Sequence, residues 1–99
     1  MRRLSKSQVA HHLKSVPGWA LRAGMLRRLF VFEDFAKAMA FVNRVARLSE
    51  KHDHHPDIDI RWNKVSLAYT THSKGGLTGS DFAMARLAGA LAAGPARRR

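Results

Sequence analysis

Residues 57–72 carry two runs in which apolar and polar residues alternate, and these runs limit the fold more than any other feature of the chain. Alternation with a period of two is typical of strands that bury one face. The apolar positions of the first run are Ile58, Ile60 and Trp62, and those of the second are Val65, Leu67, Tyr69 and Thr71. Because only Asn63-Lys64 is left for a tight turn, the pattern predicts an antiparallel hairpin with Trp62 in the core.

The segment before this hairpin has helical periodicity. Asp34 can cap its start, and we expect the helix to run to about Lys51 or His52, because the proline at position 56 disfavours helical backbone before it. The predicted apolar stripe of this helix consists of Phe35, Ala38, Met39, Val42, Val45 and Ala46.

Helical periodicity returns after the hairpin and a loop. Thr78 and Asp81 form an approximate capping box at the start of this last helix, and we expect it to end before Gly94-Pro95. Its apolar positions are Phe82, Met84, Ala85, Leu87, Ala88 and Leu91. Small residues along it would allow close approach of a second chain, and these are Ala83, Ala85, Ala88, Gly89, Ala90, Ala92 and Ala93.

The N-terminal third predicts a helix and a second hairpin. Residues 5–16 have helical spacing up to Pro17-Gly18, and two strands, 19–23 and 25–32, flank a turn at Gly24. The element order is therefore α-β-β-α-β-β-α. Strands with one apolar face need helices over that face, so we expect an α+β two-layer sandwich, a four-stranded antiparallel sheet with three helices on one face.

Length predicts a single domain. A chain of 99 residues is the size of one small domain, for which oligomerisation is a natural source of extra stability. We expect residues 1–99 to form this domain, with flexible basic ends at about 1–4 and 95–99. No apolar run approaches the roughly 20 residues of a membrane helix, and no signal-peptide core follows the first residues, so a cytoplasmic protein is expected.

Charge and cysteine content narrow the function classes. The formal net charge is +11, but five of the arginines lie at the chain ends. Without them 13 basic residues face 7 acidic ones, a balance of +6, and no nucleic-acid motif is present, which argues against a nucleic-acid partner. The absence of cysteine excludes disulfides, thiolate zinc sites and a cysteine nucleophile.

Residues 51–62 include three histidines and three aspartates within a short segment, a pattern that fits a metal site, a catalytic site or a polar turn. Geometry counts against the metal. Asp57 and Asp59 share the strand face opposite the isoleucines, towards solvent, and the side chains of the adjacent His54 and His55 diverge before a proline. We therefore predict no metal site.

Pairing within the predicted hairpin favours the catalytic interpretation. The open end of the hairpin should bring residues near 55–57 beside those near 70–72. His54, His55 and His72 would then converge at the edge of the sheet, with a carboxylate from the end of the preceding helix. The unperturbed pKa of histidine is about 6.5, so two imidazoles can act as general acid and general base near neutral pH.

A longer spacing pattern carries a family resemblance. Its seven fixed positions over 32 residues are Glu50, His54, His55, Pro56, Trp62, His72 and Asp81. This pattern resembles the signature of the pterin-4a-carbinolamine dehydratases. Gly18-Trp19, residues 30–35 and Asn63-Lys64-Val65 agree with the same family, and so does the predicted element order.

The resemblance implies an activity. It implies dehydration of a 4a-hydroxytetrahydropterin, the carbinolamine that forms when an aromatic amino-acid hydroxylase uses tetrahydropterin, to quinonoid dihydropterin and water. It implies no cofactor and a pterin as the small-molecule partner. A homodimer or homotetramer and a functional link to such a hydroxylase are also expected, with no membrane partner.

The resemblance also implies roles for individual residues. His54, His55 and His72 would be the catalytic histidines, with His54 and His72 near the leaving hydroxyl and His55 holding or deprotonating the pterin ring. The residues expected to bind the substrate or to orient a catalytic side chain are Glu50, Asp53, Thr70, Thr71 and Asp81.

Plainer interpretations stay open for several positions. Glu50 could be a solvated helix carboxylate, and Asp81 could equally be a helix cap. Trp62 is expected in the core rather than against a pterin, and His52 is expected on the surface. For the whole chain, the alternative to an enzyme is a non-catalytic dimerisation or assembly cofactor that binds another protein.

Overall fold

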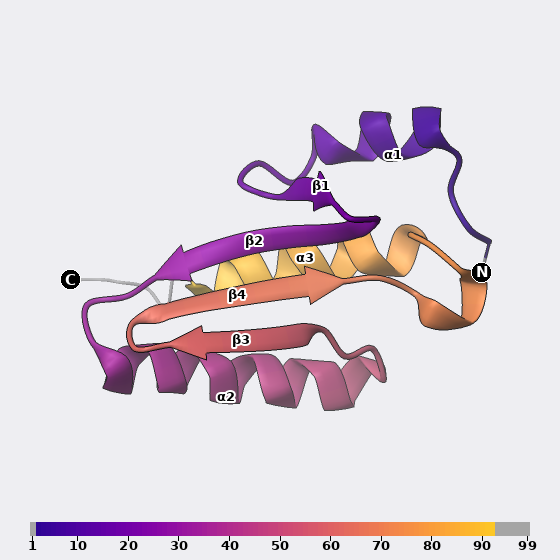
Figure 1. Cartoon of the computed structure of the whole chain (residues 1–99). Helices are drawn as coiled ribbons and strands as arrows, with labels where there is room; N and C mark the ends of the chain where they lie inside the picture. Colours follow the sequence, from indigo (N-terminus) through magenta and orange to yellow (C-terminus); the bar gives the residue numbers. More distant parts are fainter. Residues whose placement is uncertain (1, 93–99) are drawn as a thin grey trace.

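The computed structural model of the chain describes residues 2–92 and confirms the predicted element order (Figure 1). The helices are α1 (Lys6–Leu13), α2 (Phe35–His52) and α3 (Gly79–Ala92), with a short 3₁₀ helix, η1 (His72–Lys74), before α3. The strands are β1 (Ala20–Arg22), β2 (Met25–Val31), β3 (Asp57–Arg61) and β4 (Lys64–Tyr69). They form one antiparallel sheet in the order β1-β2-β4-β3.

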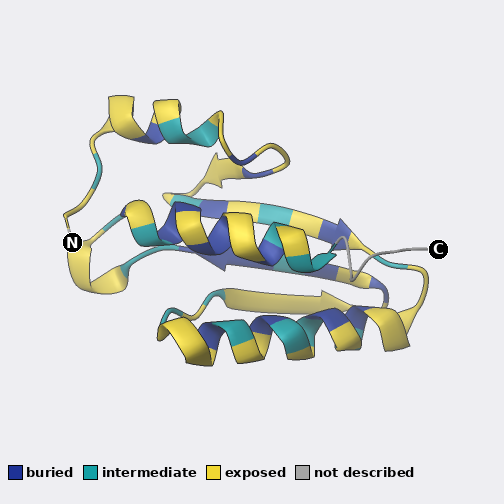
Figure 2. Ribbon diagram, turned by 180° about the vertical axis from the view of Figure 1, so that it is seen from behind, coloured by how far each residue is buried: buried dark blue, intermediate teal, exposed yellow. Residues whose placement is uncertain are grey.

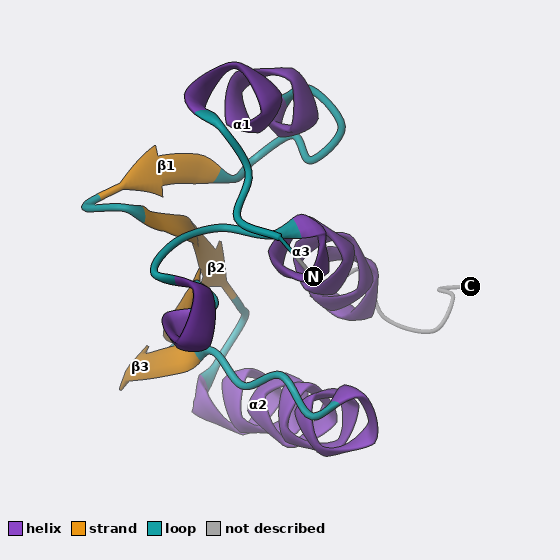
Figure 3. Ribbon diagram, turned by 90° about the vertical axis from the view of Figure 1, so that its right-hand side faces the viewer, coloured by secondary structure: helices purple, strands orange, loops and turns teal. Residues whose placement is uncertain are grey.

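The helices lie on one side of the sheet, as the end-on view of Figure 3 shows. Buried side chains concentrate on the two central strands and on the helix faces that meet them (Figure 2). The core residues of β2 and β4 are Leu26, Phe30, Val65, Leu67 and Tyr69. Those of α2 and α3 are Ala38, Phe41, Val45, Phe82, Met84, Ala85 and Ala88. The predicted two-layer α+β sandwich is therefore confirmed.

All three helices begin at capping residues, and those of α2 and α3 are the predicted ones. Ser5 Oγ accepts a hydrogen bond from the Gln8 N–H, and the Gln8 side chain accepts one from the Ser5 N–H, which makes a complete capping box for α1. Asp34 Oδ1 accepts a hydrogen bond from the Lys37 N–H at 2.9 Å and caps α2. The last positions predicted for the first helix form turns instead, ahead of the proline that stops it.

The second hairpin is present, but three predictions about it are wrong. Its turn consists of Trp62 and Asn63, one residue earlier than Asn63-Lys64. Trp62, predicted in the core, lies in this turn with a φ of 52° and is 65% exposed. Ile58 and Ile60 are each 38% exposed rather than half-buried in a covered strand face, because β3 is an edge strand.

The buried face of α2 differs from the predicted stripe. Ala38 and Val45 are buried as expected, but Phe41 and Ser49 complete the buried face, and Phe35 is half exposed in the first turn. Ser49 is tolerated there because its hydroxyl donates to the Val45 carbonyl at 2.8 Å, so no buried polar group is left unpaired. The other positions predicted as apolar helix positions and found exposed are Ala46 and Leu87.

Part of the segment predicted as a flexible start packs against the fold. The Leu4 N–H donates to the Leu77 carbonyl at 2.8 Å, and Arg3 Nη1 donates to the Gly75 carbonyl at 3.4 Å. The predictions for residues 95–99 and for the helix end at Gly94-Pro95 lie outside the described residues. Among residues 2–92, none of the helices combines the length and the apolar character that crossing a membrane requires.

Candidate active site

The C-terminal end of α2 positions the first two histidines. Asp53 ends the helix with a φ of 51°, a left-handed conformation that aspartate adopts more readily than most residues. The His54 N–H then donates to the Ser49 carbonyl at 3.1 Å. After this reversal the two adjacent histidines lie in different environments, with the His54 side chain 16% exposed and that of His55 53% exposed.

His54 lies against a buried carboxylate. Its Nε2 is 2.7 Å from Asp81 Oδ1, and the Asp81 side chain is 0% exposed. An ionised carboxylate only accepts hydrogen bonds, so Nε2 of His54 carries the proton of this contact and Nδ1 is the nitrogen left for other chemistry. The imidazole also stacks on Tyr69, with ring centroids 5.9 Å apart and planes within 5°.

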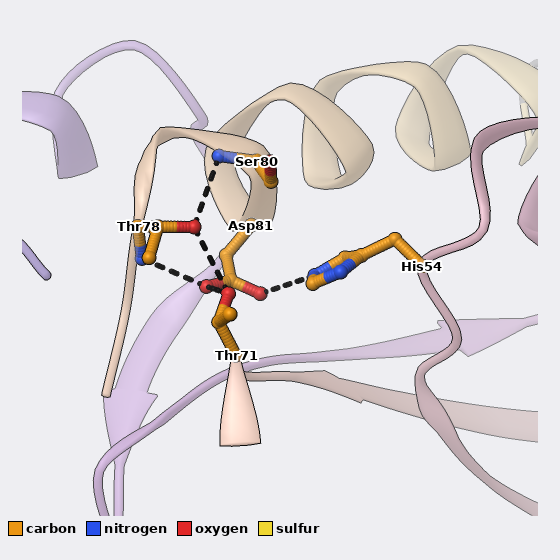
Figure 4. Close-up of polar contacts among 5 residues, drawn as sticks. All are labelled: His54, Thr71, Thr78, Ser80 and Asp81. Atoms are coloured by element: carbon orange, nitrogen blue, oxygen red, sulfur yellow. Dashed lines mark hydrogen bonds and ion pairs between the residues drawn. The ribbon is translucent and has the colours of Figure 1, made fainter. Parts of the chain in front are cut away.

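A hydrogen-bond network holds Asp81 in place (Figure 4). Asp81 Oδ2 accepts from the Thr71 hydroxyl at 2.8 Å and from the Thr78 N–H at 2.9 Å. Because Thr71 gives its single hydroxyl proton to Asp81, Thr78 must be the donor in the 2.9 Å contact between the two threonine hydroxyls. Thr78 Oγ1 in turn accepts from the Ser80 N–H at 3.3 Å.

Asp81 combines a helix-cap contact with a contact to a distant histidine. The bond from the Thr78 N–H is the contact of a capping box, as predicted for the start of α3. The bond to His54 reaches a segment 27 residues away. A buried carboxylate needs hydrogen-bond donors at both oxygens. Here Oδ2 accepts the bond of the helix cap and Oδ1 accepts the bond from His54.

His55 pairs with Glu50 at the surface. Its Nε2 lies 2.6 Å from Glu50 Oε2, and the two side chains are 53% and 79% exposed. An exposed pair of this kind contributes no more than about 1 kcal/mol to stability because solvent screens it. Glu50 is therefore a partner of His55 and at the same time a solvated helix carboxylate.

Within residues 2–92, the third predicted histidine has no carboxylate partner of the kind that His54 and His55 have. His72 is exposed at the start of η1, and its side chain has no hydrogen-bond or ion-pair partner within residues 2–92. It directly follows Thr71, whose hydroxyl binds the carboxylate that holds His54. Two more predicted site residues, Asp53 and Thr70, likewise make no side-chain hydrogen bond in the described part of the chain.

The remaining acidic and histidine residues of the cluster do not assemble into a metal site. Asp59 forms an ion pair with Arg61 at 2.9 Å, and Asp57 is exposed at the start of β3. His52 is exposed at the end of α2, as predicted. Across residues 2–92 no three histidine, aspartate or glutamate side chains are arranged to hold a metal ion.

Tyr69 is the site residue that the sequence did not indicate. It is fully buried, with its ring centroid 5.9 Å from those of both His54 and Trp19. Its hydroxyl is buried without a hydrogen-bond partner among the described residues. Burial raises the pKa of Tyr69 to about 12, and the charge of Asp81 adds to the shift. Strand alternation predicted that Tyr69 faces inward, but gave no signal that a histidine would stack on it.

Comparison with known proteins identifies the family. The profile of the family described as "Pterin 4 alpha carbinolamine dehydratase" matches residues 2–91. The chain belongs to the pterin-4a-carbinolamine dehydratase family. The resemblance read from the spacing of the histidines is therefore confirmed, and family membership supports a pterin dehydratase, a lyase, as the activity of this chain.

Relatives of the dehydratase family match over most of their length. A protein of Thermomicrobium roseum is 50% identical over 92 residues, which cover 93% of this chain and 99% of the relative. A protein of Acidobacterium capsulatum is 49% identical over 85 residues, which cover 86% and 92% of the two chains. Both carry the name pterin-4-alpha-carbinolamine dehydratase as a provisional assignment.

Two solved structures share the fold of this chain. The crystal structure of a transcriptional coactivator/pterin dehydratase from Brucella melitensis has a TM-score of 0.88 and 35% identity, and the match covers 92% of this chain and 99% of that one. A pterin dehydratase-like protein identified as a RuBisCO assembly factor in the alpha-carboxysome has a TM-score of 0.62 and 28% identity, with 75% and 86% covered.

Proposed function

We propose that this chain converts a 4a-hydroxytetrahydropterin to quinonoid dihydropterin and water by general acid and general base catalysis, in the recycling of tetrahydropterin. The observation that carries the proposal is the 2.7 Å contact between His54 Nε2 and the buried carboxylate of Asp81. When one ring nitrogen of a histidine is fixed in this way, the other is presented in a defined direction, and the tautomer of the neutral ring is set. Such an arrangement suits a group that exchanges protons with a substrate.

The reaction requires two proton transfers. The bond between ring carbon 4a and the hydroxyl oxygen breaks, and the oxygen takes a proton from an acid to leave as water. The adjacent ring nitrogen loses its proton to a base, and the electron pair of that N–H bond forms the new C=N double bond. Loss of water from the pterin involves no net transfer of electrons, so side chains that give and take protons are sufficient for the chemistry.

We assign His54 and His72 to the leaving hydroxyl. The Nδ1 of His54 is the nitrogen free to give a proton, because Nε2 is occupied by Asp81, and the carboxylate stays beside the ring in both protonation states. His72 follows Thr71 in the chain, and its imidazole is free of side-chain partners within residues 2–92, so it is available to the same hydroxyl.

We assign His55 to the pterin ring. Glu50 accepts a hydrogen bond from His55 Nε2, which leaves Nδ1 as the lone pair that can hold or deprotonate the ring nitrogen. The position of His55 at the surface suits a base that must be reached by a substrate from solvent. Asp53 and Thr70 are proposed to bind the polar edge of the pterin, and Thr71 and Asp81 to act through His54.

A direct test uses the carbinolamine itself. It would be generated with an aromatic amino-acid hydroxylase and tetrahydropterin, and its decay followed by absorbance with and without the purified chain. We expect the decay rate to rise in proportion to the concentration of the chain. A His52→Ala variant tests whether the rate depends on histidine content alone, and it should remain active. A folded chain that leaves the spontaneous decay unchanged would rule out the enzyme.

A second candidate function is that of a dimerisation or assembly cofactor. The exposed Ile58, Ile60 and Trp62 are apolar groups that another protein could cover, and the names of the two structural neighbours include a coactivator and an assembly factor. A variant with His54, His55 and His72 all replaced by alanine separates the two functions, because a pure scaffold would keep its whole biological effect. Light scattering would test the proposed homodimer or homotetramer.

A further inference from the structure

Arg28 occupies an unusual place in the sheet. It lies in the middle of β2 opposite Leu67, a buried residue of β4, and so points to the side that the helices cover. Its guanidinium carbon is 4.4 Å from the centroid of the Phe30 ring. Within residues 2–92 its guanidinium has no hydrogen-bond or ion-pair partner. Burying part of a cation without a carboxylate partner costs free energy, so a ligand that supplies an acceptor would lower that cost.

A cavity of about 160 Å³ lies beside this guanidinium. Its walls come from the loop after α1, from β2 and from α3. The residues that matter for its chemistry are Pro17, Trp19, Arg28, Ala85, Arg86 and Gly89. The volume is below the roughly 300–1,000 Å³ of pockets that take drug-sized ligands, so the cavity has room for a small functional group and not for a pterin.

The charged groups of the cavity are all hydrogen-bond donors. Arg28 and Arg86 both line the cavity, and the one hydrogen bond of the Arg86 guanidinium within residues 2–92 is a long 3.4 Å bond to the Phe82 carbonyl. Trp19 adds its indole N–H. No aspartate or glutamate lines the cavity. A group of donors with two positive charges and no acidic partner matches an anion with several acceptor oxygens.

Gly89 keeps these donors accessible. The position that a Cβ atom would occupy at Gly89 lies 3.2 Å from Arg28 Nη1 and 3.8 Å from Trp19 Nε1. Both donors therefore face the same point on α3, and a side chain at this point would stand between them and the cavity. Gly18 borders the other side of the guanidinium, where a Cβ atom would lie 3.1 Å from the Arg28 Nε.

We propose that this cavity is a binding site for a carboxylate carried on a small apolar body, held by Arg28, Arg86 and the Trp19 indole. The planar fork of arginine matches the two oxygens of a carboxylate, and the apolar walls at Pro17 and Ala85 suit the carbon next to it. A free short-chain carboxylic acid and the C-terminus of a peptide both offer this group. The site uses none of the histidines and stands whether or not the chain is a dehydratase.

The two tryptophans of the chain make the test specific. ¹⁵N-labelled protein would be titrated with propionate to about 50 mM at constant ionic strength, with propionamide as the uncharged isostere and phosphate as a different oxyanion. We expect propionate to move the Trp19 indole N–H signal saturably, while the signal of the exposed Trp62 stays in place. N-acetylalanine in a parallel titration distinguishes a peptide C-terminus from a free acid as the preferred source.

Charge-matched variants complete the test. Arg28→Gln should weaken propionate binding at least about tenfold, and Arg86→Gln, at an exposed position that folding should tolerate, about threefold. Arg27→Gln removes the same charge from the preceding residue of β2, which points to the opposite face of the sheet. This variant should bind propionate within twofold of the wild-type affinity. The proposal is overturned if propionate moves the Trp19 and Trp62 signals alike, or if propionamide or phosphate moves the Trp19 signal as strongly as propionate does. It is also overturned if Arg27→Gln and Arg28→Gln weaken propionate binding equally.

Discussion

His54 Nε2 and Asp81 Oδ1, 2.7 Å apart, join the connection before β3 to the first turn of α3. Asp81 is fully buried, so the imidazole is positioned from inside the protein and not by a mobile surface group. The same carboxylate accepts the hydrogen bond from the Thr78 N–H that caps α3. Stability and the proposed catalysis therefore depend on one side chain, and variants near it separate the two contributions.

Asp81→Asn should lower both the stability of the fold and the rate of the proposed reaction. The amide N–H₂ cannot accept a hydrogen bond, so it leaves either His54 or the Thr71 and Thr78 donors without an acceptor. We expect a loss of about 1–3 kcal/mol in the free energy of unfolding and at least a tenfold fall in kcat/KM. Urea unfolding and the carbinolamine assay measure the two effects. The control is Asp57→Asn, the same chemical change at an exposed position, which should be nearly neutral. Equal results for the two variants would contradict the role of the network.

Thr71→Val tests the network from the other side. Valine has the shape of threonine but cannot donate to Asp81 Oδ2, and the hydroxyl of Thr78 also loses its acceptor. We expect a loss of about 1–2 kcal/mol in stability and a several-fold fall in kcat, with KM less affected because Thr71 acts through His54. Thr70→Val is the matched control for stability, since the hydroxyl of Thr70 makes no hydrogen bond within residues 2–92. A larger stability loss from Thr70→Val would be inconsistent with this account.

The sequence predicted the elements whose signals are local. Asp34 and the capping residues of α1 and α3 act on the few residues next to them, and all three helices begin where predicted. The errors concern burial. Alternation shows that Ile58 and Ile60 share a strand face, but not that the strand ends before Trp62 or whether a helix covers that face. That depends on β3 lying at the edge of the sheet, which is a property of strand order.

The candidate site was likewise predicted only in part. Hairpin pairing correctly indicated that the residues before β3 lie near those after β4, since Asp57 is opposite Ala68. It could not fix the position of His72 relative to the other histidines, because β4 ends at Tyr69 and the chain turns into η1. The stacking of His54 on Tyr69 could not be predicted from the sequence either. It depends on the left-handed backbone at Asp53, which turns the following residue inward, and no periodic pattern encodes such a reversal.

The histidines should differ in their effect on catalysis. His54→Ala and His72→Ala should each lower kcat/KM about a hundredfold, because each removes a proposed proton-transfer group from the leaving hydroxyl. His52→Ala should lower it less than twofold, since His52 is exposed and makes no side-chain hydrogen bond within residues 2–92. The measurement is the carbinolamine decay at several pH values. Equal losses from all three variants would show that the site has been placed wrongly.

Tyr69→Phe tests the buried hydroxyl beside the site. The hydroxyl has no partner within residues 2–92, so its removal should cost nothing at neutral pH and should stabilise the fold by up to about 1 kcal/mol.

At alkaline pH the difference in stability between Tyr69→Phe and the wild type should grow. Burial raises the pKa of Tyr69 to about 12 from its usual 10.0, so the wild type keeps its full stability below pH 10 and loses part of it as the pH rises from 10 through 12. The wild type should therefore lose roughly 1 kcal/mol more than Tyr69→Phe between pH 8 and pH 11. Tyr69 is the single tyrosine of the chain, so phenolate absorbance reports its titration directly. A folded protein whose phenolate forms near pH 10 would contradict the buried environment assigned to this ring.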